Sequence, residues 1–177
     1  MQMMKDKKVL AGGAVLLVAL FWFYVKPHYL AAKPPVVFTA AQIASAPKPT
    51  IILGQPADPK VAETWEGLKM NLKAASNDPH YVLAVIALEF ADPKHTYVGL
   101  TAAPAIDAKN TAFAAALEPD MHKVLDATTG VFGAKSLDDL AAPTGREQLK
   151  TDLMTAINAQ LHGQQVVGVY FETFITQ

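Results

Sequence analysis

Five histidines are the residues of this chain best suited to metal or acid–base chemistry, and none of them forms a recognisable metal-binding pair. No two stand at the i,i+2 or i,i+4 spacing that brings two imidazoles to one metal ion. The chain has no cysteine, so a metal site would have to gather histidines and carboxylates from distant segments. We therefore predict no metal site and no cofactor. The histidines are His28, His80, His95, His122 and His162.

An adjacent carboxylate pair, Asp138 and Asp139, is the next candidate for acid–base catalysis. Neighbouring residues of a helix point in different directions, and Ser136 just upstream suits a helix cap, so a capping role explains the pair. Ser136 and Ser76 lack the G-x-S-x-G setting of an activated serine nucleophile. The sequence therefore favours a protein that is not an enzyme, and we assign no catalytic residue.

The charge of the chain is balanced. Lysine and arginine number 15 against 16 aspartates and glutamates in 177 residues, which gives a net charge of −1. A nucleic-acid-binding domain usually carries a basic stripe, and no run of like charge is present, so we exclude nucleic acid as a partner. The lack of cysteine means that the fold needs no disulfide, which is compatible with an extracytoplasmic compartment.

The apolar run from Val9 to Val25 determines where the rest of the chain can lie. Its 17 residues would form a helix about 26 Å long, near the lower limit for crossing a hydrocarbon core of about 30 Å. Lys8 and Lys26 can reach the two headgroup layers. We expect an uncleaved membrane-spanning helix, with a cleaved signal peptide and a buried core helix as the alternatives. Its main bilayer contacts are expected at Val9, Leu16, Leu17, Leu20, Phe21, Trp22, Tyr24 and Val25.

This helix divides the chain into four predicted parts. Residues 1–8 form a tail with three lysines, which favours the cytoplasm, and residues 9–25 span the inner membrane. Seven prolines in residues 26–60 disfavour a long helix and predict a semi-rigid tether, with a short turn at residues 39–44 and an edge strand at residues 51–53. Residues 61–177 are long enough for one extracytoplasmic domain.

Strand patterns begin and end this domain. Residues 65–73 and 81–90 predict two strands joined at Asn77-Asp78-Pro79, the second being apolar on both faces and therefore central. Val166 to Gln177 alternates and predicts a final strand with one nearly all-apolar face.

Helix patterns fill the middle. We expect a loop over residues 94–107, a helix capped by Asn110, and a fresh helix after Pro119 that ends near Gly133. A short helix capped by Ser136 follows, and then a helix whose Thr144 and Glu147 form a capping box. The element order predicts an α+β fold with helices on one face of a sheet that contains antiparallel strands. The expected buried faces comprise Met121, Val124, Leu125, Thr128, Val131 and Phe132, and then Leu149, Leu153, Ile157 and Leu161.

The final strand resembles the closing segment of the flagellar basal body-associated FliL family. Members of that family tend to end in a pattern like V-x-x-V-Y-F-x-x-F-x-x-Q. Three further segments resemble the family in the same order: the strand YVLAVIALEF, the proline-led helix with its Ser-x-x-Asp-Leu turn, and the Gly-Arg helix ending in Ile157-Asn158. The closing pattern is matched by Val166, Val169, Tyr170, Phe171, Phe174 and Gln177.

This resemblance implies a non-enzymatic, single-pass inner-membrane protein of the flagellar basal body. It implies a domain similar to the stomatin/prohibitin-type SPFH fold that assembles into a homo-oligomeric ring at the MotA/MotB stator and supports motility or swarming. An anchored binding or scaffold module of the cell envelope, unrelated to flagella, remains the alternative, and an anchored hydrolase is the third possibility.

Overall fold

The computed structural model describes residues 36–54, 67–74 and 79–177. The predicted membrane-spanning residues 9–25 and residues 75–78 at the predicted turn lie outside these ranges. Within them, no helix has both the length and the apolar character needed to cross a membrane. Thr39–Gln177 forms one compact unit.

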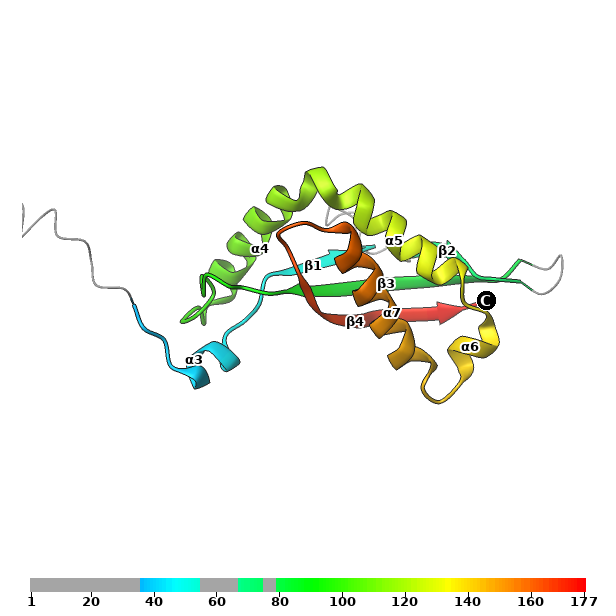
Figure 1. Ribbon diagram of the computed structural model, residues 1–177, viewed down its shortest axis with the longest axis horizontal. Coiled ribbons are helices and arrows are strands. Elements are labelled where there is room, and N and C mark those ends of the chain that lie inside the picture. The colour runs from blue at the N-terminus through cyan, green and yellow to red at the C-terminus, as the bar shows by residue number, and fades with distance from the viewer. Residues whose placement is uncertain (1–35, 55–66, 75–78) are drawn as a thin grey trace, which may run out of the picture. The chain divides into compact units, whose positions relative to one another are not determined.

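An antiparallel sheet of four strands is built around one central strand, β3 (Figure 1). β1 pairs with the second half of β3 and β2 with the first half, whereas β4 pairs along nearly all of it. Because a strand has only two edges, β1 and β2 must lie end to end along one edge of β3, with β4 along the other. The predicted strands, including the edge strand at residues 51–53, are confirmed, but β2 covers only Leu68–Asn71 of the strand predicted over residues 65–73. Their bounds are Thr50–Leu53 (β1), Leu68–Asn71 (β2), Tyr81–Phe90 (β3) and Val166–Thr176 (β4).

Two glycines allow β1 and β2 to approach the same point of β3. Gly54 follows β1 with φ +85°, and Gly67 precedes β2 with φ +109°. A Cβ atom at Gly54 would lie 2.9 Å from the carbonyl oxygen of Ala84, and one at Gly67 would lie 2.7 Å from the same oxygen. Both the backbone angles and the close approach therefore require glycine.

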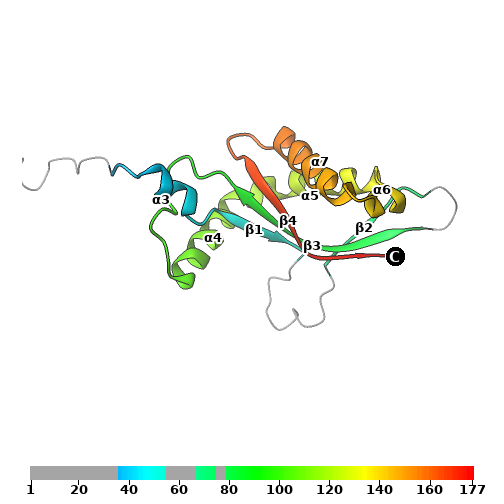
Figure 2. The same cartoon turned by 90° about the horizontal axis from the view of Figure 1, so that it is seen from below.

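Helices α5 and α7 lie side by side on one face of the sheet, which we call the inner face (Figure 2). Helix α5 also contacts β2, and α7 contacts β4. The molecule thus has the mixed helix-and-antiparallel-sheet architecture that the sequence predicts. The helical elements are α3 (Ala40–Ser45), α4 (Ala103–Leu117), the 3-10 turn η3 (Glu118–Asp120), α5 (Met121–Gly133), α6 (Leu137–Ala141) and α7 (Gly145–Gln160).

The hydrophobic core fills the space between the inner face and the helices. Every second residue of β3 is buried in it, from Val82 to Phe90, and each of these is at most 1% exposed. The predicted stripe of α7 is confirmed, because Leu149, Leu153 and Ile157 are also at most 1% exposed. Burial of such aliphatic side chains contributes about 1.5–3 kcal/mol each relative to exposure.

The buried face of α5 is confirmed except at Leu125. Val124, Thr128 and Phe132 are almost fully buried, and the helix ends at Gly133, as predicted. Pro119, predicted in the first turn of this helix, lies instead in the 3-10 turn that precedes it. Leu125 is 37% exposed, so its assignment to the core was wrong. It lies about 100° around the helix from Val124, at the margin of the packed face.

The start of α4 differs from the prediction. The helix begins at Ala103, so the loop predicted over residues 94–107 ends earlier and Asn110 is not its cap. The prediction treated Pro104 as part of a loop. It occupies instead the first turn of the helix, where the missing N–H of proline costs nothing. Asn110 lies within α4, where its Oδ1 accepts from the Thr50 N–H and from the Tyr97 hydroxyl, each at 3.1 Å.

One of the two predicted capping motifs is confirmed. At α6, Ser136 Oγ accepts from the Asp139 N–H at 3.2 Å, and the Asp139 carboxylate accepts from the Ser136 N–H at 2.9 Å. At α7 the predicted capping box is wrong: Thr144 precedes the helix but makes no capping bond, and Glu147 instead accepts from Lys150 at 2.7 Å. The ψ of 0° at Thr144 is not the extended conformation that a side-chain cap requires.

An ion pair joins the segment after α5 to α7. Lys135 Nζ lies 2.6 Å from Asp152 Oδ2, and this hydrogen bond is the main reason that the pKa of Asp152 lies below its usual value of 3.8. A carboxyl group whose pKa is lower in the folded state binds fewer protons there. The ion pair therefore stabilises the fold at a pH above the pKa that Asp152 has in the unfolded chain. This stabilisation is lost as the pH falls through the lower pKa that Asp152 has in the folded state.

We expect the Asp152→Asn substitution to remove part of the acid sensitivity of the fold. The free energy of unfolding, from urea titrations between about pH 6 and pH 2, should fall less steeply for the variant than for the wild type. Asp107→Asn is the matched control, because the structure gives the exposed Asp107 carboxylate no ion pair with another described residue. Equal pH dependence in both variants would contradict the stabilising role of the Lys135–Asp152 pair.

Candidate interaction surface

The C-terminal motif lies in β4, apart from Gln177 just after it, and two β-bulges explain the spacing of its apolar residues. The β3–β4 register shifts between Val85 and Ile86 and again between Glu89 and Phe90. Each shift inserts one extra residue in β4, so successive core residues stand three apart at the bulges and two apart between them. The simple alternation predicted for this strand was therefore wrong. The motif residues that reach the core are Val166, Val169, Phe171 and Phe174.

The other two motif residues lie on the opposite side of the sheet, the outer face, and bond to β3. The Tyr170 hydroxyl donates to Glu89 Oε2 at 3.3 Å. Its ring covers Gly168, where a Cβ atom would lie 2.8 Å from a ring carbon. Gln177 Oε1 accepts from the Tyr81 hydroxyl, and the backbones of these two residues exchange both hydrogen bonds at 2.9 Å. The motif thus divides into core residues and outer-face residues.

Asn158, from the Ile-Asn pair at the end of α7, holds the start of β4 in place. Its Oδ1 accepts from the Val166 N–H at 2.7 Å, and its Nδ2 donates to the Val166 carbonyl at 2.9 Å. One amide therefore satisfies both backbone groups of Val166 and prevents another strand from pairing there. The family resemblance includes Asn158, but the spacing of residues in the sequence does not predict that its side chain bonds to the backbone of Val166.

We expect Asn158→Ala to lower the free energy of unfolding by about 1–3 kcal/mol, because it leaves a buried N–H and carbonyl without partners. Urea unfolding followed by circular dichroism measures the loss. Gln160→Ala, an exposed change at the end of the same helix, is the control and should be nearly neutral. A similar loss in both variants would show that the amide bonds contribute nothing specific.

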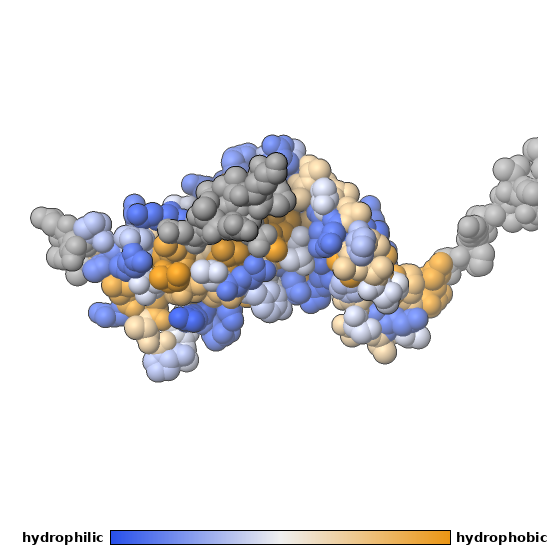
Figure 3. All heavy atoms as spheres, turned by 180° about the vertical axis from the view of Figure 1, so that it is seen from behind, coloured by the Kyte–Doolittle hydropathy of each residue, from blue (hydrophilic) through white to orange (hydrophobic). Residues whose placement is uncertain are grey.

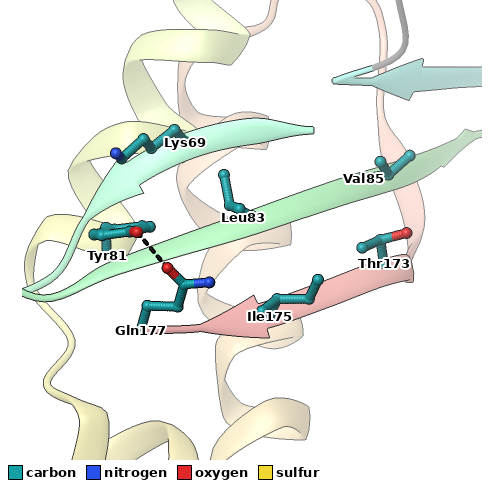
Figure 4. A pocket seen from close by; sticks show the side chains of 7 residues that line it. All are labelled: Lys69, Tyr81, Leu83, Val85, Thr173, Ile175 and Gln177. Atoms are coloured by element: carbon teal, nitrogen blue, oxygen red, sulfur yellow. Dashed lines mark hydrogen bonds between the residues drawn. The ribbon is translucent and has the colours of Figure 1, made fainter. Parts of the chain in front are cut away.

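The outer face carries an open groove at the end where β2 and the last residues of β4 flank β3 (Figure 4). Its volume is about 570 Å³. Leu83 and Val85 form an apolar floor and are 8% and 9% exposed, whereas Ile175 at the rim is 47% exposed. We call this the outer-face groove. Its lining residues are Lys69, Tyr81, Leu83, Val85, Thr173, Ile175 and Gln177.

The chemistry of the outer-face groove suits contact with another protein surface. Lys69 is the one charged side chain among its described lining residues, and its Nζ lies 3.9 Å from the centroid of the Tyr81 ring. The Tyr81 hydroxyl already donates a hydrogen bond to Gln177 Oε1. Figure 3 shows apolar side chains gathered on this side of the molecule beside polar ones. An apolar centre with a sparse charged rim is typical of protein interfaces.

A second hollow of about 410 Å³ lies beside the loop after β3, and its lining residues Asp92, Thr96 and Tyr97 take part in hydrogen bonds within the fold. Burial alone would raise the pKa of Asp92, but hydrogen bonds from the Tyr97 N–H at 2.8 Å and from Thr96 hold this pKa below its usual value. Burial and the nearby Asp92 charge raise the pKa of the Tyr97 hydroxyl, which donates to Asn110. This cluster ties the loop to α4.

Across the described ranges, no group of three or more histidines and carboxylates is placed to hold a metal ion. Asp139 serves as a cap, and Asp138 is exposed. The predicted membrane-anchor residues lie outside the described ranges. We call the two bonds from the Asn158 amide to the Val166 backbone the Asn158 clamp. The structure thus brings together the C-terminal motif, the Asn158 clamp and the outer-face groove, and these are features of packing and contact.

Comparison with known proteins covers the same part of the chain. Residues 64–177 match the model of a family described as flagellar basal body-associated protein FliL. A relative named flagellar protein FliL, from Aquifex aeolicus (strain VF5), is 28% identical over 119 residues, or 67% of each chain. The family match spans β2 to β4 with all the intervening helices, and so includes the motif, the clamp and the groove. The chain therefore belongs to the FliL family of flagellar basal body-associated proteins.

Proposed function

We propose that this protein is a structural, ring-forming component of the flagellar basal body that supports the motor stator. Residues 9–25 anchor it in the inner membrane, with residues 1–8 in the cytoplasm. Residues 26–60 connect the anchor to a periplasmic domain at residues 61–177. Copies of the domain form a ring beside MotA and MotB, and the ring supports the rotation that drives swimming or swarming.

The observation that carries this proposal is the family match over residues 64–177, which include β2 to β4 and the helices α4 to α7. The character of the outer-face groove supports it, because an apolar floor with a single charged rim residue suits binding of a protein surface. Anchoring in one membrane also confines the copies to two dimensions. This raises their effective concentration, so that modest contacts between domains suffice for assembly.

Deletion of the gene, followed by complementation, tests the proposal. We expect smaller swimming zones in soft agar for the deletion strain, and full recovery with the wild-type gene. A second complementing gene encodes the domain behind a cleavable signal peptide in place of residues 1–25, and it should fail to restore swimming. Filament counts by electron microscopy separate loss of motor function from loss of flagella. Normal swimming after deletion would overturn the flagellar proposal.

A further inference from the structure

We propose that the outer-face groove receives the helical layer of a neighbouring copy of this chain, so that successive copies associate front to back. The helical layer is the segment 118–141, which comprises η3, α5 and α6. This inference rests on the ring-forming role proposed above and names the surfaces that would form the ring.

The first support is the unequal covering of the sheet. Helices α5, α6 and α7 contribute to the core on the inner face, whereas the outer face presents Tyr170 at 50% and Ile175 at 47% exposure. The floor residues Leu83 and Val85 are only 8% and 9% exposed, so a second layer over the groove would mainly bury the rim, above all Ile175. A sheet face can be covered by a layer of helices. A helical layer from another copy would supply that cover over the groove.

The second support is charge complementarity between the two surfaces. Segment 118–141 carries five carboxylates and two lysines, a net charge of −3. Both lysines are already paired, Lys123 with Asp120 and Lys135 with Asp152. Lys69 at the groove makes no ion pair within the described part of the chain. The exposed carboxylates of the layer that likewise have no ion pair with a described residue are Glu118, Asp126 and Asp138.

The third support is an exposed apolar side chain beside one of these carboxylates. Leu125 is the large hydrophobic residue of α4–α7 that is exposed in the described structure, and Asp126 follows it. Ile175 and Lys69 offer the matching pair at the groove, one apolar and one cationic. We therefore place Leu125 of one copy against Ile175 of the next, with Asp126 close to Lys69.

The symmetry of such a contact fits a ring. Outer-face residues line the groove and the helical layer packs on the inner face, so each copy uses a different surface toward each of its two neighbours. A heterologous contact of this kind repeats from copy to copy and closes into a ring when the rotation between copies allows it. Parallel membrane anchors would align the rotation axis with the membrane normal.

Engineered cysteines test the contact directly, because the chain has none of its own. The full-length protein is oxidised in native membranes with Thr173→Cys, with Asp126→Cys, and with both substitutions in one chain. We expect a ladder of dimers, trimers and larger products only when both cysteines are present, and dimers when the two single variants are co-expressed. Dimers from Thr173→Cys alone would show groove-to-groove pairing. No product in any variant would show that another segment or protein covers the groove. Either result overturns the inference.

A charge exchange in the double-cysteine chain provides the second test. For this test the α5 cysteine is placed at the exposed Thr129 in every variant, so that Asp126 is retained. Lys69→Glu or Asp126→Lys should each reduce the ladder several-fold. The two changes combined should restore it. Lys94→Glu, an exposed change away from the groove, is the matched control and should leave the ladder unchanged. If the ladder is absent but the deletion strain still swims poorly, the front-to-back contact is wrong while the flagellar role stands.

Discussion

Replacing Gly145 by alanine is expected to lower the free energy of unfolding by about 3 kcal/mol or more. A Cβ atom at this position would lie 2.0 Å from the carbonyl oxygen of Asp139 and 3.1 Å from that of Leu140. Both neighbours are backbone atoms, so α6 and α7 would have to separate to admit a single methyl group. Urea unfolding of the purified full-length protein, followed by circular dichroism, measures the loss.

Gly130→Ala is the matched control for this prediction. Gly130 lies in α5, and a Cβ atom added there would meet no neighbouring group within 4 Å. Alanine there should raise the free energy of unfolding by about 0.5–1 kcal/mol, because glycine is a poor residue for a helix interior. The same chemical change is thus expected to have opposite signs at the two positions. Equal effects would contradict the close α6–α7 contact.

Replacing Phe132 by alanine is expected to cost about 3–5 kcal/mol of stability. Phe132 is fully buried in the core, where its ring centroid lies 6.3 Å from that of Phe174 in β4. The substitution removes the largest side chain that α5 contributes to the core and leaves a cavity against the sheet. The shift of the urea midpoint, with the slope of the transition unchanged, measures this cost.

Leu125→Ala provides the comparison on the same helix. Its partial exposure predicts a loss of no more than about 1 kcal/mol. Under the front-to-back contact it should nevertheless weaken cross-linking between copies. If Phe132→Ala and Leu125→Ala destabilise the protein equally, the assignment of the two residues to core and surface is wrong.

Segments with a long and regular pattern were predicted well from the sequence. β3 has the predicted bounds because nearly all of its ten residues, on both faces, are apolar, and such a run suits a central strand. The stripe of α7 was predicted because Leu149, Leu153 and Ile157 repeat every four residues. In both cases, burial of the apolar side chains and local backbone preference favour the same structure.

Other features depend on tertiary geometry that a local pattern does not report. Pro104 is compatible with both a loop and a first helical turn, and only packing of the later α4 residues against the sheet decides between them. The bulges in β4 depend on its register with β3, which alternation within β4 does not contain. The role of Asn158 needs a backbone partner eight residues away in β4.

The structure gives the closing motif of the chain a physical meaning. The three-residue steps between its apolar members mark the two bulges, and these members reach the core on either side of them. Tyr170 and Gln177 bind β3 from the outer face, the second of them at the groove itself. The same strand therefore completes the core and shapes the surface proposed for assembly.

The most direct test of the structural, motor-associated role is cryo-electron tomography of flagellar motors in wild-type and deletion strains. We predict that the difference map shows density on the periplasmic side of the inner membrane, next to the stator, which is lost on deletion and regained on complementation. Identical averaged motors in the two strains would contradict that role.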